Sequence, residues 1–152
     1  MSLWLLRHGQ AHAQAPRDDL RELTEHGRTQ VRLSAEHLQG IELDLVLVSP
    51  YLRAQQSADE LCTALGYAGP RKVADWLTPE SSVSQALTEL DAYEGHSLLL
   101  VTHQPFVGEL VGLLISGSRQ LSLPMNTASL ARLDGPCIAA GAMSLTDIFH
   151  PL

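Results

Sequence analysis

Three places in the sequence put a cationic or imidazole side chain directly after an apolar run or at the start of the segment that follows it. Arg7 and His8 follow a run of four apolar residues and precede Gly9, Arg53 follows a second run, and His103 follows a third. A guanidinium offers a rigid fork of donors to phosphoryl oxygens, and an imidazole can act as nucleophile, base or acid near neutral pH. These residue types therefore indicate a phosphate site. Gly9 would let the backbone approach a bound group closely.

Arg53 has two interpretations. Ser49 could cap a helix with Pro50 as its first residue, and Gly66 could end it. Arg53 would then lie in the first turn, where the helix dipole favours anions over cations. It is either a solvated surface arginine or a residue that faces a bound anion together with the free N–H groups of the helix start.

Apolar patterns predict strands that alternate with helices. Short apolar runs bounded by turn residues indicate strands at 3–6, 43–48, 71–74 and 97–102, and strand-like stretches follow at 129–133 and 142–149 around an Asp-Gly-Pro turn. Helical spacing indicates helices between a Thr24 cap and Gly40, between Ser49 and Gly66, from about 82 to Tyr93, and from Pro105 onward.

This alternation predicts a three-layer α/β/α sandwich with a mostly parallel central sheet, closed by an antiparallel hairpin at the sheet edge, in a single domain that spans residues 1–152. The carboxyl ends of parallel strands lie along one edge of a sheet. We therefore expect Arg7 and His8, the segment 49–53, and His103 to meet there. Two imidazoles and two guanidiniums at one phosphorus suit transfer through a phosphohistidine that water then hydrolyses, with no metal or cofactor.

Composition narrows the class of protein. A net charge of −7 and a pI near 5.4 argue against binding to a nucleic-acid backbone. Cys62 and Cys137 fit neither a disulfide framework nor a zinc spacing. No segment has the pattern of a secretory signal or the length needed to span a bilayer. We expect a cytoplasmic protein without membrane or nucleic-acid partners.

The motifs Arg7-His8-Gly9, Ser49-Pro50-Tyr51-Leu52-Arg53-Ala54 and Thr102-His103-Gln104-Pro105 resemble those of the histidine phosphatase superfamily, most closely its small SixA-type phosphohistidine phosphatase branch. The resemblance covers most of the chain in order. It implies a phosphoglycerate mutase-like fold, with His8 as the phosphorylated nucleophile and Arg7, Arg53 and His103 as the phosphate pocket.

The proton donor is the residue that this resemblance leaves open. Members that act on phosphate esters commonly carry an acidic donor on an insertion before the late strand, and that region is short here. Glu80, Asp18 and Asp19 are the candidates, although exposed loop carboxylates are usually only solvated. Imidazole can leave already protonated, so a site without a strong acid suits P–N cleavage.

The sequence therefore favours a phosphatase for phosphohistidine on a protein such as a histidine phosphotransfer domain. Two alternatives stay open: a phosphomonoesterase for a small phosphorylated metabolite, and a phosphate-recognition module without catalysis. A zinc site at His8 and His12 is disfavoured, because Gly9 and the strand end argue against a helix there. Ser57 is expected to face solvent rather than support the pocket.

Overall fold

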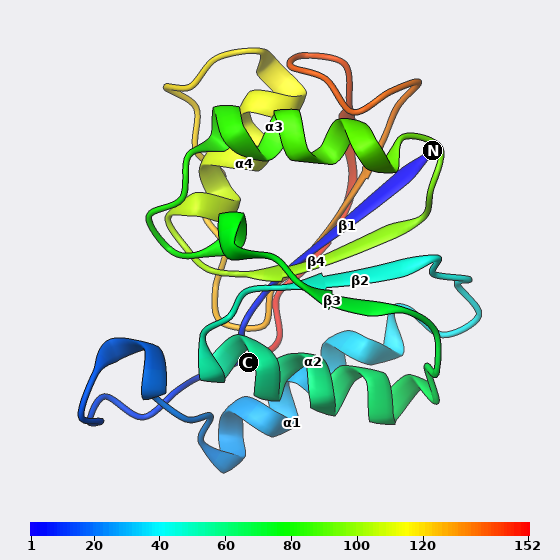
Figure 1. The fold of residues 1–152 in the computed structure, drawn as a ribbon. Coiled ribbons are helices and arrows are strands. Elements are labelled where there is room, and N and C mark those ends of the chain that lie inside the picture. The colour runs from blue at the N-terminus through cyan, green and yellow to red at the C-terminus, as the bar shows by residue number, and fades with distance from the viewer.

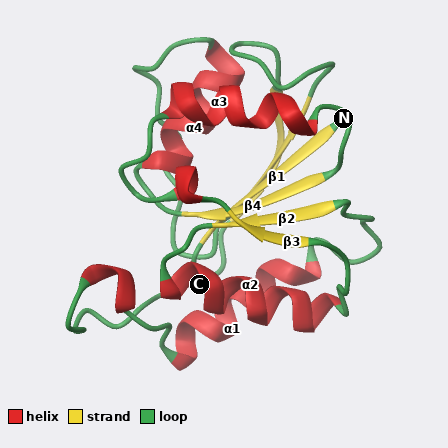
Figure 2. Cartoon of the chain, viewed as in Figure 1, coloured by secondary structure: helices red, strands yellow, loops and turns green.

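The computed structural model describes residues 1–152 and contains one six-stranded sheet between two layers of helices (Figures 1 and 2). The strands are β1 (Ser2–Arg7), β2 (Leu45–Val48), β3 (Arg71–Val73), β4 (Leu98–Thr102), β5 (Leu130–Asp134) and β6 (Ser144–Phe149), in the spatial order β3-β2-β4-β1-β5-β6. The four α-helices are α1 (Glu25–Glu36), α2 (Leu52–Leu65), α3 (Val83–Leu90) and α4 (Phe106–Ser116). The predicted three-layer architecture is confirmed.

The central strands β1 and β4 bring the N-terminal motif beside the late one. They run parallel, with Arg7 paired to Thr102 in register, so that His8 and His103 leave neighbouring strands at the same edge. Strand β2 is parallel to β4 on the other side and delivers Ser49 to that edge as well. The expected antiparallel hairpin is present, since β5 pairs with β1 and β6 with β5 in antiparallel fashion.

Side chains that alternate along β1 fill both halves of the core. Trp4 and Leu6 face the layer of α1 and α2, whereas Leu3 and Leu5 face the layer of α3 and α4. All four are at most 4% exposed, as is typical of a parallel strand covered on both faces. The rigid middle of the sheet thus fixes where each strand ends. Trp76, like Trp4, is a packing residue of the core.

Several helix boundaries differ from the predicted ones. Thr24 caps α1 as expected, because its side chain accepts from the Gly27 N–H, but the helix ends at Glu36, before Gly40. Helix α2 ends at Gly66 in the left-handed conformation, as predicted.

The start of α2 corrects the sequence prediction. Tyr51, not Ser49, is the capping residue, and the first helical residue is Leu52 rather than Pro50. The reason is that Ser49 still belongs to the sheet edge, where its N–H donates to the Val101 carbonyl. Helix α4 shows a smaller shift, since Pro105 is its capping residue rather than its first residue. Helix α3 ends at Leu90, where a 3-10 turn takes over. No helix in the structure is both long and apolar enough to cross a bilayer.

Candidate active site

His8 lies at the carboxyl end of β1 with only 6% of its surface exposed. The backbone N–H of His8 donates to the Thr102 carbonyl, and the ring Nδ1 lies 2.7 Å from the Gly9 carbonyl oxygen. A carbonyl can only accept, so Nδ1 carries the proton and Nε2 keeps its lone pair. Burial, reinforced by the positive charge of Arg53, lowers the pKa of His8 to about 3, although the bond to Gly9 opposes this. The ring is therefore neutral at physiological pH, as a nucleophile must be.

Arg53 lies in the first turn of α2 and is 4% exposed, which rules out the solvated-surface interpretation. Its Nε–H donates to His8 Nε2 across 3.2 Å. Its two terminal nitrogens donate to Asp18, Nη1 to the backbone carbonyl at 2.7 Å and Nη2 to the carboxylate at 3.1 Å. The guanidinium also lies 5.0 Å from the centre of the Tyr51 ring. Asp18 thus holds the terminal nitrogens in place while the Nε–H points at the nucleophile.

His103 is fully buried at the carboxyl end of β4. Its ring centre lies 5.0 Å from that of His8, and the two planes are inclined by 60°. Nε2 lies 2.7 Å from the hydroxyl of Ser49, whereas Nδ1 is buried without a hydrogen-bond partner. Burial, then the neighbouring His8 and Arg53, lowers the pKa of His103 to about 2. The two imidazoles, which are far apart in the sequence, share one site, and His103 is neutral as well.

Arg7 is the second guanidinium at this edge. Its Nη1 donates to the Met125 carbonyl at 2.9 Å, while Nε is buried and has no partner. Burial lowers the pKa of Arg7 first, and the positive charge of Arg53 lowers it further, which places the two cations near each other. Arg53 pairs with Asp18, but Arg7 forms no salt bridge, so an anion would suit as its missing partner.

Gly9 and Ser57 connect the nucleophile segment to α2. The Gly9 N–H donates to the Ser57 hydroxyl at 3.0 Å, and that hydroxyl donates to the Arg53 carbonyl at 2.8 Å. Ser57 is fully buried, so the prediction that it faces solvent is wrong. A Cβ on Gly9 would lie 2.5 Å from the Gly27 carbonyl oxygen, so close packing against α1 requires this glycine. The contact of Gly9 with phosphate stays a prediction. The Gly9 N–H already donates to Ser57.

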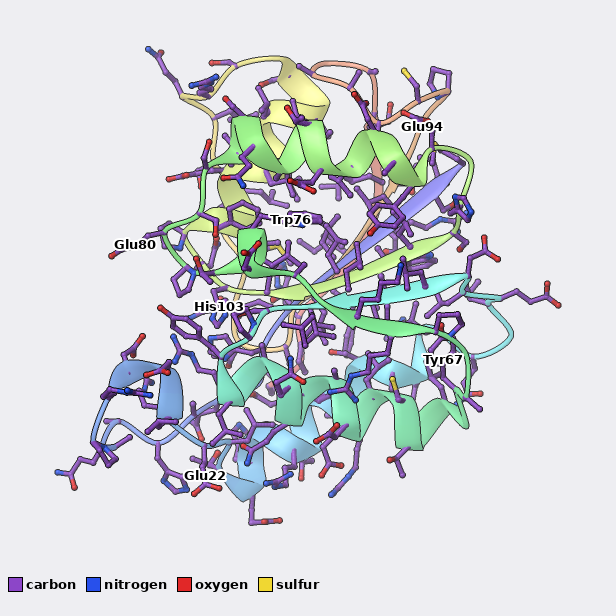
Figure 3. The ribbon with its side chains drawn as sticks, viewed as in Figure 1. Glu22, Tyr67, Trp76, Glu80, Glu94 and His103 are labelled. Atoms are coloured by element: carbon purple, nitrogen blue, oxygen red, sulfur yellow. The ribbon has the colours of Figure 1, made fainter.

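The three candidate proton donors are placed differently. Asp18 lies in a short 3-10 helix, η1 (Asp18–Leu20), that reaches Arg53. Burial would raise the pKa of its carboxyl, but hydrogen bonds from Arg21 and Arg53 outweigh that effect and lower it. Asp19 pairs with the exposed Arg17. Glu80 is exposed on the loop before α3, on the same side of the molecule as His103 (Figure 3). None of the three makes a hydrogen bond to His8 or His103.

Sequence reasoning missed one residue that touches the site and the contact of another. Arg21 donates to the Asp18 carboxylate at 3.1 Å, and its positive charge contributes to the lowered pKa of both His8 and His103. The sequence predicts Ser49 at this edge, within segment 49–53, but only as a helix cap; its contact with His103 is the part that the sequence does not predict.

Known proteins resemble this chain in sequence and in fold. Residues 3–77 match the sequence model of the histidine phosphatase superfamily (branch 1). The chain is 37% identical over 134 residues to the phosphohistidine phosphatase SixA of Escherichia coli strain K12, which covers 85% of this chain and 81% of the relative. It is 31% identical to a phosphohistidine phosphatase SixA homolog of Haemophilus influenzae, with 89% and 90% covered.

Solved structures agree with the sequence comparisons. The structure of the protein histidine phosphatase SixA complexed with tungstate superposes with a TM-score of 0.89 at 31% identity, covering 99% of this chain and 97% of that one. A putative phosphohistidine phosphatase SixA from Agrobacterium tumefaciens superposes with a TM-score of 0.82 at 25% identity, covering 99% and 97%. Sequence, fold and the paired imidazoles lead to one conclusion: the chain belongs to the histidine phosphatase superfamily.

Proposed function

We propose that this protein removes phosphate from a phosphorylated histidine of another protein, through a covalent phosphohistidine on His8. The observation that carries the proposal is the state of His8: a buried, neutral imidazole whose Nδ1 proton is donated to the Gly9 carbonyl, so that Nε2, which accepts from Arg53, carries the lone pair that can attack. The SixA relatives, named as phosphohistidine phosphatases, support the same substrate class.

The chemistry follows from these contacts. The Nε2 lone pair of His8 attacks phosphorus while the P–N bond of the substrate breaks and its electron pair returns to the leaving imidazole. Positive charge that develops on the His8 ring is stabilised by the Gly9 carbonyl, which accepts from Nδ1 at 2.7 Å. Arg7 and Arg53 bind the equatorial phosphoryl oxygens, and His103 donates to one of them. Water then attacks the phosphohistidine and releases inorganic phosphate.

The leaving group explains why a phosphorylated histidine is favoured over a phosphate ester. An alkoxide needs a proton from an acid in the site, whereas imidazole, with a reference pKa of about 6.5, can leave already protonated. Asp18 is linked to His8 through Arg53, which contacts both residues. Arg21 and Arg53 lower the pKa of the Asp18 carboxyl and keep it ionised, so Asp18 is a poor acid. A substrate that brings its own proton suits this site best.

The partner we propose is a histidine phosphotransfer domain of a bacterial phosphorelay, in the cytoplasm, where dephosphorylation would lower the signal. Such a domain carries its phosphohistidine on a folded surface, and the short segment between β3 and α3 leaves no large insertion to stand in its way.

The test is a single-turnover assay with a phosphotransfer domain labelled with radioactive phosphate on histidine. Wild-type protein should release labelled phosphate, and a rapid quench should trap an acid-labile label on His8. His8→Ala should show neither. His12→Ala is the matched control, because this exposed histidine four residues away has no side-chain contact with the site, and it should behave as wild type.

The same assay identifies the competing outcomes. Rapid turnover of p-nitrophenyl phosphate with no release from any phosphohistidine protein would overturn the substrate class and favour a phosphomonoesterase. Tight binding of the labelled domain without turnover or label on His8 would overturn catalysis altogether.

A further inference from the structure

Ser49 contacts both a catalytic imidazole and the start of α2. It is fully buried at the end of β2, and its hydroxyl oxygen lies 2.7 Å from Nε2 of His103. The same oxygen accepts a hydrogen bond from the Tyr51 N–H at 3.2 Å. Because the residue is excluded from solvent, its hydroxyl proton must find an acceptor among these neighbours.

Counting donors and acceptors fixes the direction of the bond to His103. A serine hydroxyl has one proton to donate, and the Tyr51 N–H is itself a donor, so it cannot receive that proton. The only acceptor within hydrogen-bond distance of the Ser49 hydroxyl is Nε2 of His103. Ser49 therefore donates, Nε2 holds the lone pair, and the proton of the neutral ring resides on Nδ1.

The Nδ1 of His103 is the atom that this arrangement leaves free. It is buried and has no hydrogen-bond partner, which is rare for a polar atom inside a protein. The Tyr51 ring meets His103 edge-on at 5.0 Å, and the His8 ring lies at the same distance. An unpaired donor beside the nucleophile has a natural acceptor in a phosphoryl oxygen.

We propose that Ser49 is a positioning residue that holds His103 in the neutral tautomer protonated at Nδ1, so that this N–H donates to a phosphoryl oxygen during transfer. The last step rests on the proposed function, whereas the tautomer does not. Both histidines then carry their proton on Nδ1, but His8 attacks through Nε2 whereas His103 donates through Nδ1. The Gly9 carbonyl accepts from Nδ1 of His8 and leaves the attacking lone pair on Nε2, whereas Ser49 donates to Nε2 of His103 and leaves Nδ1–H to donate.

Nitrogen NMR of protein labelled with 15N-histidine tests the tautomer directly, without any substrate. The His103 signals are assigned by their loss in His103→Gln. In wild type, Nδ1 of His103 should show the shift of a protonated ring nitrogen and Nε2 that of an unprotonated one. Ser49→Ala should move the ring toward the opposite tautomer or a mixture, and Ser49→Thr, which keeps the hydroxyl, should restore the wild-type pattern.

Ser34→Ala is the matched control, because Ser34 is also a fully buried serine, but its hydroxyl bonds the Ala128 carbonyl and neither imidazole. It should leave the His103 spectrum unchanged. In steady-state assays Ser49→Ala should lower kcat by about 10- to 100-fold with little change in KM, as is typical when the group that orients a site histidine is lost. Ser49→Thr should recover most of that loss.

A wild-type His103 protonated at Nε2, or an unchanged tautomer in Ser49→Ala, would overturn the inference. Failure of the proposed function looks different: the tautomer pattern would stand while no phosphohistidine protein is dephosphorylated.

Discussion

The Nε–H of Arg53 donates to Nε2 of His8 across 3.2 Å, so the group that we assign to phosphate binding touches the atom that we assign to attack. Asp18 holds the other end of the same guanidinium through its carbonyl and its carboxylate. One side chain therefore couples the nucleophile, the start of α2 and the loop that contains η1.

Replacing Arg53 by lysine should separate charge from geometry. Lysine keeps the positive charge but lacks the planar fork that can bind two phosphoryl oxygens at once. We expect kcat/KM on a phosphohistidine protein to fall by about 10²- to 10³-fold, the loss typical of one preorganised donor. Arg71→Lys is the control. Arg71 is an exposed arginine on the edge strand β3, and its side chain pairs with Asp59. Activity of Arg53→Lys within threefold of wild type would contradict the assignment.

We expect Asp18 to compete with phosphate for Arg53. Its carboxylate occupies one guanidinium nitrogen and adds a negative charge close to where an anion would bind. Asp18→Asn removes that charge, so we expect inorganic phosphate to inhibit the variant at a lower concentration, by about twofold to fivefold, the range expected for a partly exposed ion pair. Asp19→Asn breaks only an exposed pair with Arg17 and should leave inhibition unchanged. Equal inhibition constants for wild type and Asp18→Asn would show that Asp18 does not compete.

The buried imidazoles should make the fold sensitive to mild acid. Burial lowers the pKa of His8 to about 3 and that of His103 to about 2, whereas both protonate near the ordinary value of 6.5 once the chain unfolds. The unfolded chain thus binds more protons as the pH falls below 6.5, and the free energy of unfolding decreases. The slope is about 1.4 kcal/mol per pH unit for each histidine at full effect.

Urea unfolding between pH 7.5 and 5 measures this slope above the range where carboxylates titrate. Wild type should lose stability steadily below pH 6.5, and His103→Gln should show a shallower loss over the same range. Parallel curves for the two proteins would mean that His103 is not held neutral by the fold.

Gly9→Ala tests the packing between the nucleophile segment and α1. The new methyl would lie 2.5 Å from the Gly27 carbonyl oxygen, so the backbone must move and carry His8 with it. We expect destabilisation by about 1–3 kcal/mol in urea unfolding, together with reduced activity. A variant of wild-type stability would show that the segment can shift without cost.

The sequence predicted the parts of this protein that depend on local pattern. The buried strands that lead to His8 and His103 are visible because apolar runs bounded by turn residues are short-range signals, and parallel pairing then brings both strand ends to one edge. The roles of Ser49 and Ser57 depend instead on contacts with residues far away in the sequence, so the predictions of a helix cap and a solvent-facing side chain are wrong. A serine near a helix start looks the same whether it caps the helix, faces water or bonds a distant group, and only the packing of β2 and α2 against β1 decides. Asp18 contacts Arg53 through a loop whose path no local pattern specifies.

Because β1 pairs with β4, the site can form only after both strands have been synthesised. His8 is synthesised well before its imidazole partner, which follows β4, and Met125, which accepts from Arg7, comes later still. A fragment that ends before residue 103 lacks the second imidazole. Catalytic competence is therefore acquired only after β4 has been synthesised, and a product truncated before that point would carry the nucleophile without the surroundings that make it one.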